Sequence, residues 1–255
     1  MQNAIRPLAI ITGGSRGLGY EAAKALALRG FDLALIAKDG ARLATSAQTI
    51  RDHAAQSAIS DLHISTFTCD LEQPNQVRDT ISAITQSLPT PHVLMLAHGV
   101  MSEKMSKTLK TTDQEWRRVM AINLDSVFQL VNGLAPAMAD ARNGRIIIFS
   151  ACLGRMSGPG NAGGLAPYRI SKAGVNALVR NLAHETGLGA RGLLVDAICP
   201  NHSRTDMGGP DAPRSAEEGA ATAVWLATRI FNPAGSTDQE KVTGVLWEDE
   251  EIVPW

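Results

Sequence analysis

Tyr168 and Lys172 lie four residues apart, a spacing that places two side chains on the same face of a helix. A lysine ammonium beside a phenol favours the phenolate, so we expect the pKa of Tyr168 to fall from about 10 toward neutral pH. Such a tyrosine donates a proton to a carbonyl oxygen or accepts one from an alcohol. The pair alone is common, and the competing interpretation is a packed tyrosine beside a surface lysine. Its accompanying motifs decide between the two.

A glycine-rich turn at residues 12–19 is the first of these motifs. It has the spacing G-x-x-x-G-x-G, follows an apolar run directly and precedes a helical pattern. Glycines let backbone N–H groups approach a pyrophosphate, and the helix N-terminus adds the positive end of its dipole. In this setting the turn predicts a dinucleotide site rather than an ordinary tight loop. The predicted cofactor contacts are Gly13, Ser15, Arg16, Gly17, Leu18 and Gly19.

The end of the second apolar run indicates which dinucleotide binds. NAD sites usually place an acid about 20 residues after the glycines, where it binds the ribose 2′-hydroxyl. Ala37 stands at that position and Lys38 follows it. Lys38 and Arg16 together could neutralise a 2′-phosphate, which favours NADP(H) over NAD(H). The alternatives are that both cations are solvated surface charges and that Asp39 binds a ribose hydroxyl.

The elements that position these residues alternate along the chain. Apolar runs predict strands at 8–11, 32–37, 64–69, 93–97, 145–149, 193–198 and 244–247, and helical patterns lie at about 17–29, 40–57, 74–87, 113–138, 167–187 and 215–230. Most of the runs are apolar throughout, as in strands covered on both faces. The order predicts an α/β fold: one Rossmann-type domain over residues 1–255, with a doubly wound parallel sheet of about seven strands and helices on both faces.

Two segments rich in glycine and proline, 154–167 and 200–214, follow the fifth and sixth predicted strands. Both leave the carboxyl ends of strands, where open α/β sheets bind their ligands. Loops of this length are uncommon unless they are functional. We therefore expect them to form the walls of the substrate pocket.

With these motifs together, the sequence resembles the short-chain dehydrogenase/reductase family over nearly the whole chain. The matching features are the glycine turn, Asp70 after the third strand, Asn123, the Tyr168–Lys172 pair, Pro200 and Thr205. Residues 204–210, 213–220 and 253–255 look like the carbonyl-reductase branch in particular. The resemblance implies hydride transfer between NADPH and a carbonyl or alcohol, and an assembly of two or four identical subunits. The small and apolar faces of the helices at 113–138 and 167–187 suit such contacts.

The resemblance also implies roles for individual residues. Tyr168 would be the general acid or base, Lys172 would bind ribose and tune Tyr168, and Asn123 would hold a water in a proton relay. Further cofactor contacts implied in this way are Asp70 on the adenine, Leu71, Ala97, His98, Gly99, Tyr168, Lys172, Pro200, Ser203 and Thr205.

The chain departs from the family pattern at three places. Residues 96–99 read Leu-Ala-His-Gly where the family usually has Asn-Asn-Ala-Gly, so His98 either replaces a strand-tying asparagine or simply packs, and we favour a structural role. Ala151 stands where the family has its catalytic serine. Of the three nearby polar residues that could supply the missing group (Ser150, Ser157 and Asn161), we choose Ser150. Finally, residues 201–203 replace a glycine-containing turn and are expected to bring polar groups near the nicotinamide or the substrate.

Composition excludes several other classes of protein. The 255 residues carry 24 Lys and Arg against 25 Asp and Glu, so a nucleic-acid partner is not expected. Three cysteines without CxxC spacing and six histidines without HExxH spacing predict neither disulfides nor a metal site. No apolar run approaches the roughly 20 residues that span a bilayer, and no secretory signal is evident, so we expect a cytoplasmic protein. The competing functional hypothesis is a catalytically quiet nucleotide-binding protein that regulates or assembles others, motivated by Ala97 and Ala151.

Overall fold

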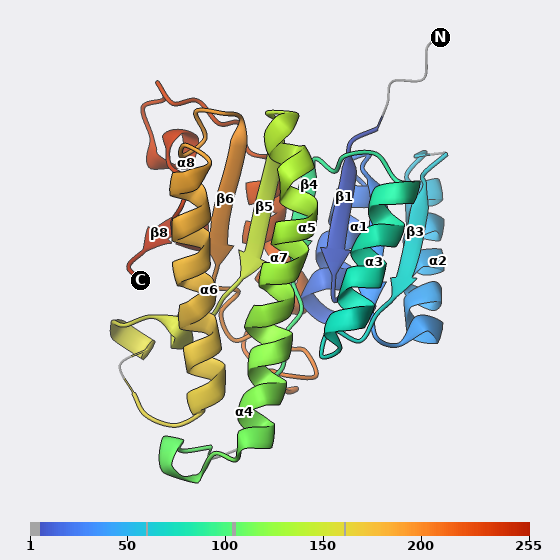
Figure 1. Cartoon of the computed structure of the whole chain (residues 1–255). Helices are drawn as coiled ribbons and strands as arrows, with labels where there is room; N and C mark the ends of the chain where they lie inside the picture. Colours follow the sequence, from blue (N-terminus) through green and yellow to red (C-terminus); the bar gives the residue numbers. More distant parts are fainter. Residues whose placement is uncertain (1–5, 60, 104–105, 161) are drawn as a thin grey trace.

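The computed structural model describes residues 6–59, 61–103, 106–160 and 162–255. The strands of the described residues are β1 (Leu8–Thr12), β2 (Asp32–Ala37), β3 (Ile64–Thr68), β4 (Val93–Leu96), β5 (Gly144–Phe149), β6 (Leu193–Ile198), β7 (Leu246–Glu248) and β8 (Glu251–Val253). They form one sheet in the order β3-β2-β1-β4-β5-β6-β7-β8 (Figure 1). All neighbours run parallel except β7 and β8.

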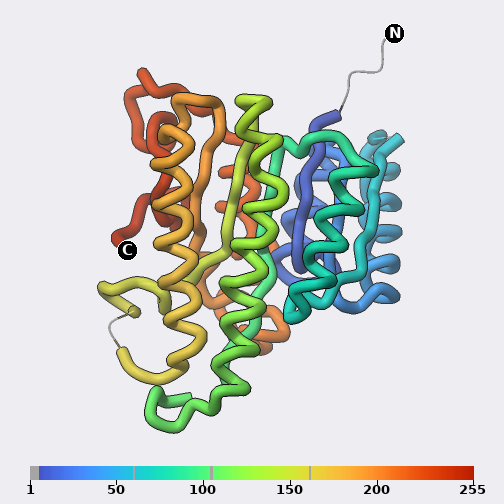
Figure 2. Tube along the Cα trace, in the orientation of Figure 1, coloured from blue at the N-terminus to red at the C-terminus, as the bar shows by residue number. Residues whose placement is uncertain are grey.

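Helices cover both faces of this sheet. They are α1 (Gly17–Ala27), α2 (Gly40–Gln56), α3 (Pro74–Ser87), α4 (Asp113–Met120), α5 (Ser126–Asp140), α6 (Ala166–Glu185), α7 (Ala216–Thr228) and the short α8 (Asp238–Lys241). In Figures 1 and 2, α3, α5 and α6 lie in front of the sheet, and α1, α2 and α7 lie behind it. The expected doubly wound α/β fold is therefore confirmed.

The hydrophobic core forms two layers, one on each face of the sheet. Alternation along β1 explains this division, because successive side chains of a strand point to opposite faces. Ile10 packs in the layer beneath α3, α5 and α6, whereas Ile11 packs in the layer beneath α1, α2 and α7, and both are fully buried. Strands buried on both sides have no polar face, which is why β1, β2 and β4 are apolar along almost their whole length.

The chain reverses its winding direction between β1 and β4. Strand β1 pairs with β2 on one side and with β4 on the other, so the connections that leave these strands run to opposite sides. A crevice opens at the carboxyl ends of the strands where such a reversal occurs, and open α/β sheets bind ligands there. Thr12 ends β1 and Leu96 ends β4, so the glycine turn and residues 97–99 meet at this crevice.

The structure differs from the expected elements in the segment 113–138. We expected one helix, but α4 and α5 are separated by a π-helical turn at Ala121–Asp125. Such turns inside helices are frequent at functional sites, and this one contains Asn123. The sequence pattern missed it because the apolar periodicity continues through the interruption. It also missed β8 and α8, which are only three and four residues long.

Candidate active site

A cleft of about 660 Å³ lies at the crevice between β1 and β4, a size typical of small-molecule sites. Most of the predicted site residues line it: Gly13, Ser15, Arg16, Gly17, Leu18, Gly19, Lys38, Leu71, Ala97, His98, Gly99, Ser150, Tyr168, Lys172, Pro200 and Thr205. The tertiary structure thus brings together residues from seven separate segments of the chain. Three predicted residues, Asp70, Asn123 and Ser203, are not part of the lining.

The glycine turn is packed too closely for side chains. A Cβ atom at Gly19 would lie 2.5 Å from the carbonyl oxygen of Gly13, and one at Gly13 would lie 3.3 Å from the carbonyl oxygen of Ala97. Gly13 and Gly17 also have positive φ angles of 70° and 57°, which glycine adopts without strain. The turn thereby leaves its backbone and the N-terminus of α1 open to the cleft. These features fit a pyrophosphate, so the residues present suit a dinucleotide.

The expected 2′-phosphate residues are both paired with carboxylates. Lys38 Nζ lies 2.7 Å from Asp70 Oδ2, so the residue expected to bind adenine and the residue expected to bind phosphate are ion-paired with each other. Arg16 Nη1 lies 2.5 Å from Asp206 Oδ2. Arg42, in the first turn of α2, also lines the cleft. Sequence reasoning missed it, although a basic residue so soon after β2 was a usable signal.

Tyr168 and Lys172 are buried on α6, at 6% and 4% exposure. The Lys172 ammonium lies 6.0 Å from the centre of the Tyr168 ring and donates to the Phe149 carbonyl at 2.6 Å. Burial lowers the pKa of Lys172 to about 8. It also raises the pKa of Tyr168 above its ordinary value, opposite to the direction that we expected. Desolvation of the phenolate is the largest cause, and the negative charge of the nearby Cys199 and Cys152 thiols acts in the same direction.

Asn123 is fully buried in the π-helical turn. Its side-chain oxygen accepts from Val100 N at 2.8 Å, and its nitrogen donates to Val100 O at 2.9 Å and to Ser171 Oγ at 3.1 Å. Ser171 Oγ in turn donates to the carbonyl of Tyr168 at 2.7 Å. Asn123 therefore connects the segment after β4 to the face of α6 that carries Tyr168, whereas its role in a water relay stays a prediction.

The hydroxyls expected to replace the missing serine have protein partners. Ser150 lines the cleft, but its Oγ donates to Asn176 Oδ1 at 2.5 Å. Ser157 Oγ donates to the carbonyl of Trp255 at 3.2 Å. Asn161 lies outside the described residues. Ala151 is buried directly after β5 and offers no hydrogen-bonding side chain. Any help from Ser150 on a substrate oxygen therefore requires it to exchange its partner.

His98 holds three parts of the site together. Its Nδ1 lies 2.6 Å from Thr12 Oγ1, and its Nε2 lies 2.9 Å from Ser126 Oγ and 3.0 Å from the Ile122 carbonyl. It thus links the end of β1 to the π-helical turn, in keeping with the structural role that we favoured. Burial, and next the Lys172 charge, lower the pKa of His98 to about 3.

This shift predicts a pH-dependent loss of stability. In the unfolded chain this histidine is protonated below about pH 6.5, whereas in the folded protein it stays neutral down to about pH 3. Stability should therefore be lost as pH falls through this window. Between pH 7 and 5, the loss due to His98 should be about 2 kcal/mol. Urea unfolding of wild type and of His98→Asn measures it: the variant should show the smaller pH dependence, and equal dependences would contradict the prediction.

Two thiols lie near Tyr168. Cys152, shortly after β5, interacts with Cys199, directly after β6, and this interaction lowers the pKa of the Cys152 thiol and raises that of Cys199. Cys69, Cys152 and Cys199 are all free thiols. The sequence gave no reason to connect Cys152 with Cys199, because the sheet brings them together across 46 intervening positions.

The polar residues 201–203 are not among the residues that line the cleft, although the flanking Pro200 and Thr205 are. His202 Nε2 lies 2.8 Å from the carbonyl of Gly208, and Ser203 Oγ donates to the carbonyl of Pro200 at 3.0 Å. These side chains instead close the loop on itself. In the described part of the chain, no group of three His, Cys, Asp or Glu side chains is arranged to hold a metal ion, and no helix has the length and apolarity to cross a bilayer.

Comparison with known proteins gives consistent matches. The model of the short chain dehydrogenase family matches residues 7–215. The 3-oxoacyl-(acyl-carrier-protein) reductase FabG of Escherichia coli K12 is 30% identical over 200 residues, covering 78% of this chain and 75% of that protein. FabG of Pseudomonas aeruginosa is 31% identical over 211 residues, covering 82% and 79%.

Solved structures agree on the fold. A short chain dehydrogenase from Salmonella enterica serovar Typhi superimposes with a TM-score of 0.80 at 23% identity, over 95% of each chain. The actinorhodin polyketide ketoreductase with NADPH gives 0.78 at 22% identity, over 94% of each chain. A blue fluorescent protein from a metagenomic library, in complex with NADPH, gives 0.78 at 24% identity, over 96% of each chain.

Proposed function

The chain belongs to the short chain dehydrogenase family, and from this premise we propose that it transfers a hydride between NADP(H) and a ketone or secondary alcohol. Membership of the family makes it an oxidoreductase. The proposal of hydride transfer rests on one observation: Tyr168 and Lys172 line the same cleft as the glycine turn. NADP(H) is supported by Arg16 and Lys38 in the same cleft, and by the NADPH named for two of the structural neighbours.

The cofactor supplies or accepts the hydride when it is bound, and the protein moves the proton. Burial keeps Tyr168 in its neutral form at neutral pH, which is the form that protonates a carbonyl oxygen during reduction. Lys172 donates to the Phe149 carbonyl, and its ammonium, 6.0 Å from the centre of the Tyr168 ring, would stabilise a developing phenolate. Asn123 fixes the backbone of Tyr168 through Ser171. Asp70 and Ser203 remain proposed cofactor contacts by resemblance.

Ser150 stays our choice for the second hydroxyl at the substrate oxygen. It is buried and lines the cleft, and it must release Asn176 to act. Because Ala151 contributes no donor, Tyr168 must stabilise the charge on the substrate oxygen with less help than it would have in a site with two hydroxyls. Loss of one such donor typically costs about 10²-fold or more in rate, so we expect a narrow range of good substrates.

The substrate is proposed as a ketone or its alcohol, and its identity is open within that class. The named relatives act on 3-oxoacyl chains and on a polyketide. The test is turnover of a panel of β-ketoesters, cyclic ketones and secondary alcohols with NADPH and with NADH, followed by the absorbance of the reduced nicotinamide. Reduction of at least one ketone with NADPH supports the proposal, and turnover with NADH alone would refute the cofactor assignment.

The second candidate is a catalytically quiet nucleotide-binding protein, favoured by Ala151 in place of the serine. Binding of NADPH without turnover across the whole panel would support it. The buried Tyr168, Lys172 and Asn123 argue against it, because a protein that only binds a nucleotide has no need for this connected set.

We also propose that the protein is cytoplasmic, since three free thiols suit a reducing compartment. We propose further that residues 1–255 form one domain.

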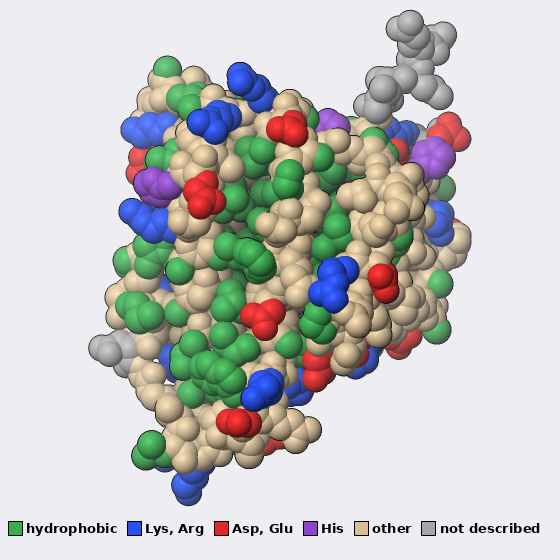
Figure 3. Space-filling view, in the orientation of Figure 1, with side chains coloured by type: hydrophobic (Ala, Val, Ile, Leu, Met, Phe, Trp, Pro, Cys, Tyr) green, Lys and Arg blue, Asp and Glu red, His purple; other side chains and the backbone are tan. Residues whose placement is uncertain are grey.

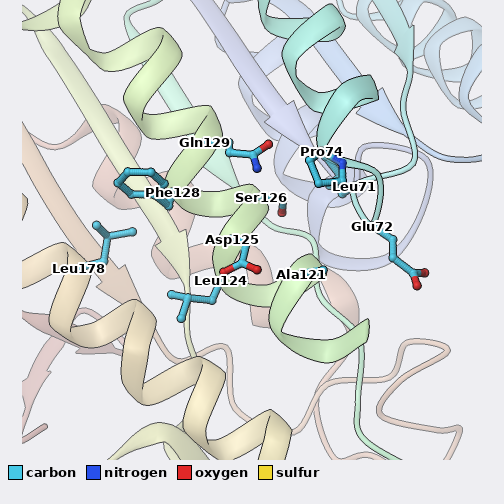
Figure 4. Close-up of a pocket in the computed structure, with 10 residues that line it drawn as sticks. All are labelled: Leu71, Glu72, Pro74, Ala121, Leu124, Asp125, Ser126, Phe128, Gln129 and Leu178. Atoms are coloured by element: carbon cyan, nitrogen blue, oxygen red, sulfur yellow. The ribbon is translucent and has the colours of Figure 1, made fainter. Parts of the chain in front are cut away.

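We further propose that the protein assembles as a homodimer or homotetramer through α4, α5 and α6. Figure 3 shows hydrophobic side chains gathered over these helices, and Trp116, Phe128 and Ile170 are 38%, 54% and 44% exposed there. A cavity of about 530 Å³ opens beside Phe128, and Leu71, Leu124 and Leu178 also line it (Figure 4). An apolar face of this kind is typical of an interaction site.

Light scattering measures this assembly. Wild type should have the mass of two or four chains at micromolar concentration, and Phe128→Asp should shift it toward the monomer because it places a charge in the interface. Ile230→Asp is the control, since Ile230 is 81% exposed directly after α7, away from this face. A monomeric wild type, or equal effects of the two substitutions, would contradict the proposal.

A further inference from the structure

Two arginines converge on one carboxylate oxygen at the edge of the cofactor cleft. Arg16 Nη1 lies 2.5 Å from Asp206 Oδ2, and Arg42 Nη1 lies 3.9 Å from the same oxygen. Arg16 precedes α1 and Arg42 lies in the first turn of α2, whereas Asp206 belongs to the loop after β6. All three residues line the cleft. The structure therefore holds an anion between two guanidinium groups at the site expected to face a 2′-phosphate.

The fold of the loop is held by other atoms than the Asp206 carboxylate. Thr205 Oγ1 accepts from Gly208 N at 3.1 Å, and the Thr205 carbonyl accepts from Gly209 N at 2.8 Å. The Thr205 methyl group also packs against the glycine turn, 3.2 Å from where a Cβ of Gly17 would lie. The loop thus already sits against the turn, and the Asp206 carboxylate adds a charge that these contacts do not require.

We propose that Arg42 is a further residue of the 2′-phosphate site and that Asp206 is its internal counter-ion, which a 2′-phosphorylated dinucleotide displaces. This inference rests on the proposed NADP(H) dependence and assigns residues to it. The 2′-phosphate carries close to two negative charges and several acceptor oxygens, whereas the carboxylate carries one charge. The planar guanidinium group of arginine matches phosphate geometry. The two arginines should therefore bind the phosphate more tightly than the Asp206 carboxylate.

The exposure of the three side chains makes this exchange easy. Those of Arg16, Arg42 and Asp206 are 55%, 47% and 62% exposed. Ion pairs this exposed contribute little to stability because water and salt screen them, so breaking them costs little. A dinucleotide without the 2′-phosphate leaves the Asp206 pair intact. Asp206 consequently lowers the affinity for NADPH, the nucleotide whose phosphate must compete with it, and leaves that for NADH nearly unchanged.

The experiment is a fluorescence titration of the full chain with NADPH and with NADH. Arg42→Gln should weaken NADPH about tenfold and NADH less than twofold, because one charge-assisted contact is lost. Asp206→Asn keeps the shape of the side chain and should strengthen NADPH about threefold, again without changing NADH. Arg29→Gln is the matched control, since Arg29 is exposed just beyond the C-terminus of α1 and does not line the cleft.

The outcomes separate this inference from the proposed function. If Arg42→Gln lost equal affinity for both nucleotides, or if Asp206→Asn bound NADPH more weakly, the inference would be overturned. The proposed function would stand as long as the wild type turns over with NADPH. A wild type that turns over with NADH alone would overturn both. A parallel titration with adenosine 2′,5′-bisphosphate and 5′-AMP should reproduce the effects of the variants without the nicotinamide, which locates them at the adenosine end.

Discussion

Replacing Tyr168 by Phe should lower kcat by about 10³-fold, the middle of the range for a positioned general acid. The substitution removes only the hydroxyl oxygen from a side chain that is 6% exposed, so phenylalanine fills the same space and the fold is retained. Binding of NADPH should change little, because the ring continues to line the cleft. The measurement is the steady-state rate with the best ketone from the panel, together with a nucleotide titration.

Tyr20→Phe provides a matched control for this experiment. The chain has only two tyrosines, and Tyr20 lies on α1 outside the cleft lining. It should keep wild-type kcat, which shows that loss of a phenol alone is not harmful. If Tyr168→Phe kept more than about a tenth of the wild-type rate, the proton would have to come from elsewhere, and the mechanism based on Tyr168 would be wrong.

Replacing Gly19 by Ala should weaken NADPH about 10- to 100-fold. The added Cβ would lie 2.5 Å from the Gly13 carbonyl oxygen and 2.9 Å from that of Thr12, and both are backbone atoms that cannot rotate away. Overpacking of this kind costs about 1–3 kcal/mol, and each 1.4 kcal/mol is tenfold in affinity. The backbone relieves the clash by moving the turn, which displaces the N–H groups that face the pyrophosphate. Nucleotide titration measures the loss.

Gly163→Ala is the matched control, because no atom of the residues that the structure describes lies within 4 Å of a Cβ at Gly163. It should bind NADPH as wild type does, and both variants should be checked for folding by circular dichroism. A folded Gly19→Ala protein with wild-type affinity for NADPH would show that the turn does not cradle the nucleotide, and it would remove the main structural support for a dinucleotide site.

The elements of the fold follow from local sequence to a large degree. Residues 74–87 form a helix with the bounds that we expected, with Pro74 at its first turn. Ser215 caps α7 through a capping box with Glu218, a contact between residues only three positions apart in the sequence. The π-helical turn around Asn123 could not be predicted, since its hydrogen bonds depend on Val100 and Ser171, which reach it only after folding.

Charges and protonation states were the least predictable part of the site. The i, i+4 spacing of Tyr168 and Lys172 fixed their shared helix face, but the direction of the Tyr168 pKa depended on burial. Likewise, Arg16 was expected at the cofactor, whereas its pairing with Asp206 required the loop after β6 to fold back over the glycine turn. Desolvation and long-range pairing are properties of the assembled molecule, so no local pattern contains them.

The sequence by itself determined the alternating α/β architecture, the glycine-rich turn and the shared helix face of Tyr168 and Lys172, because each depends on residues within one helix, strand or turn. The tertiary structure alone decided that His98 binds Thr12 and Ser126, that Ser150 binds Asn176, and that Arg42 faces Asp206. Each of these contacts joins segments distant in the chain. Their geometry is set by how the sheet and its helices pack, and it is this packing that converts a set of motifs into one cleft.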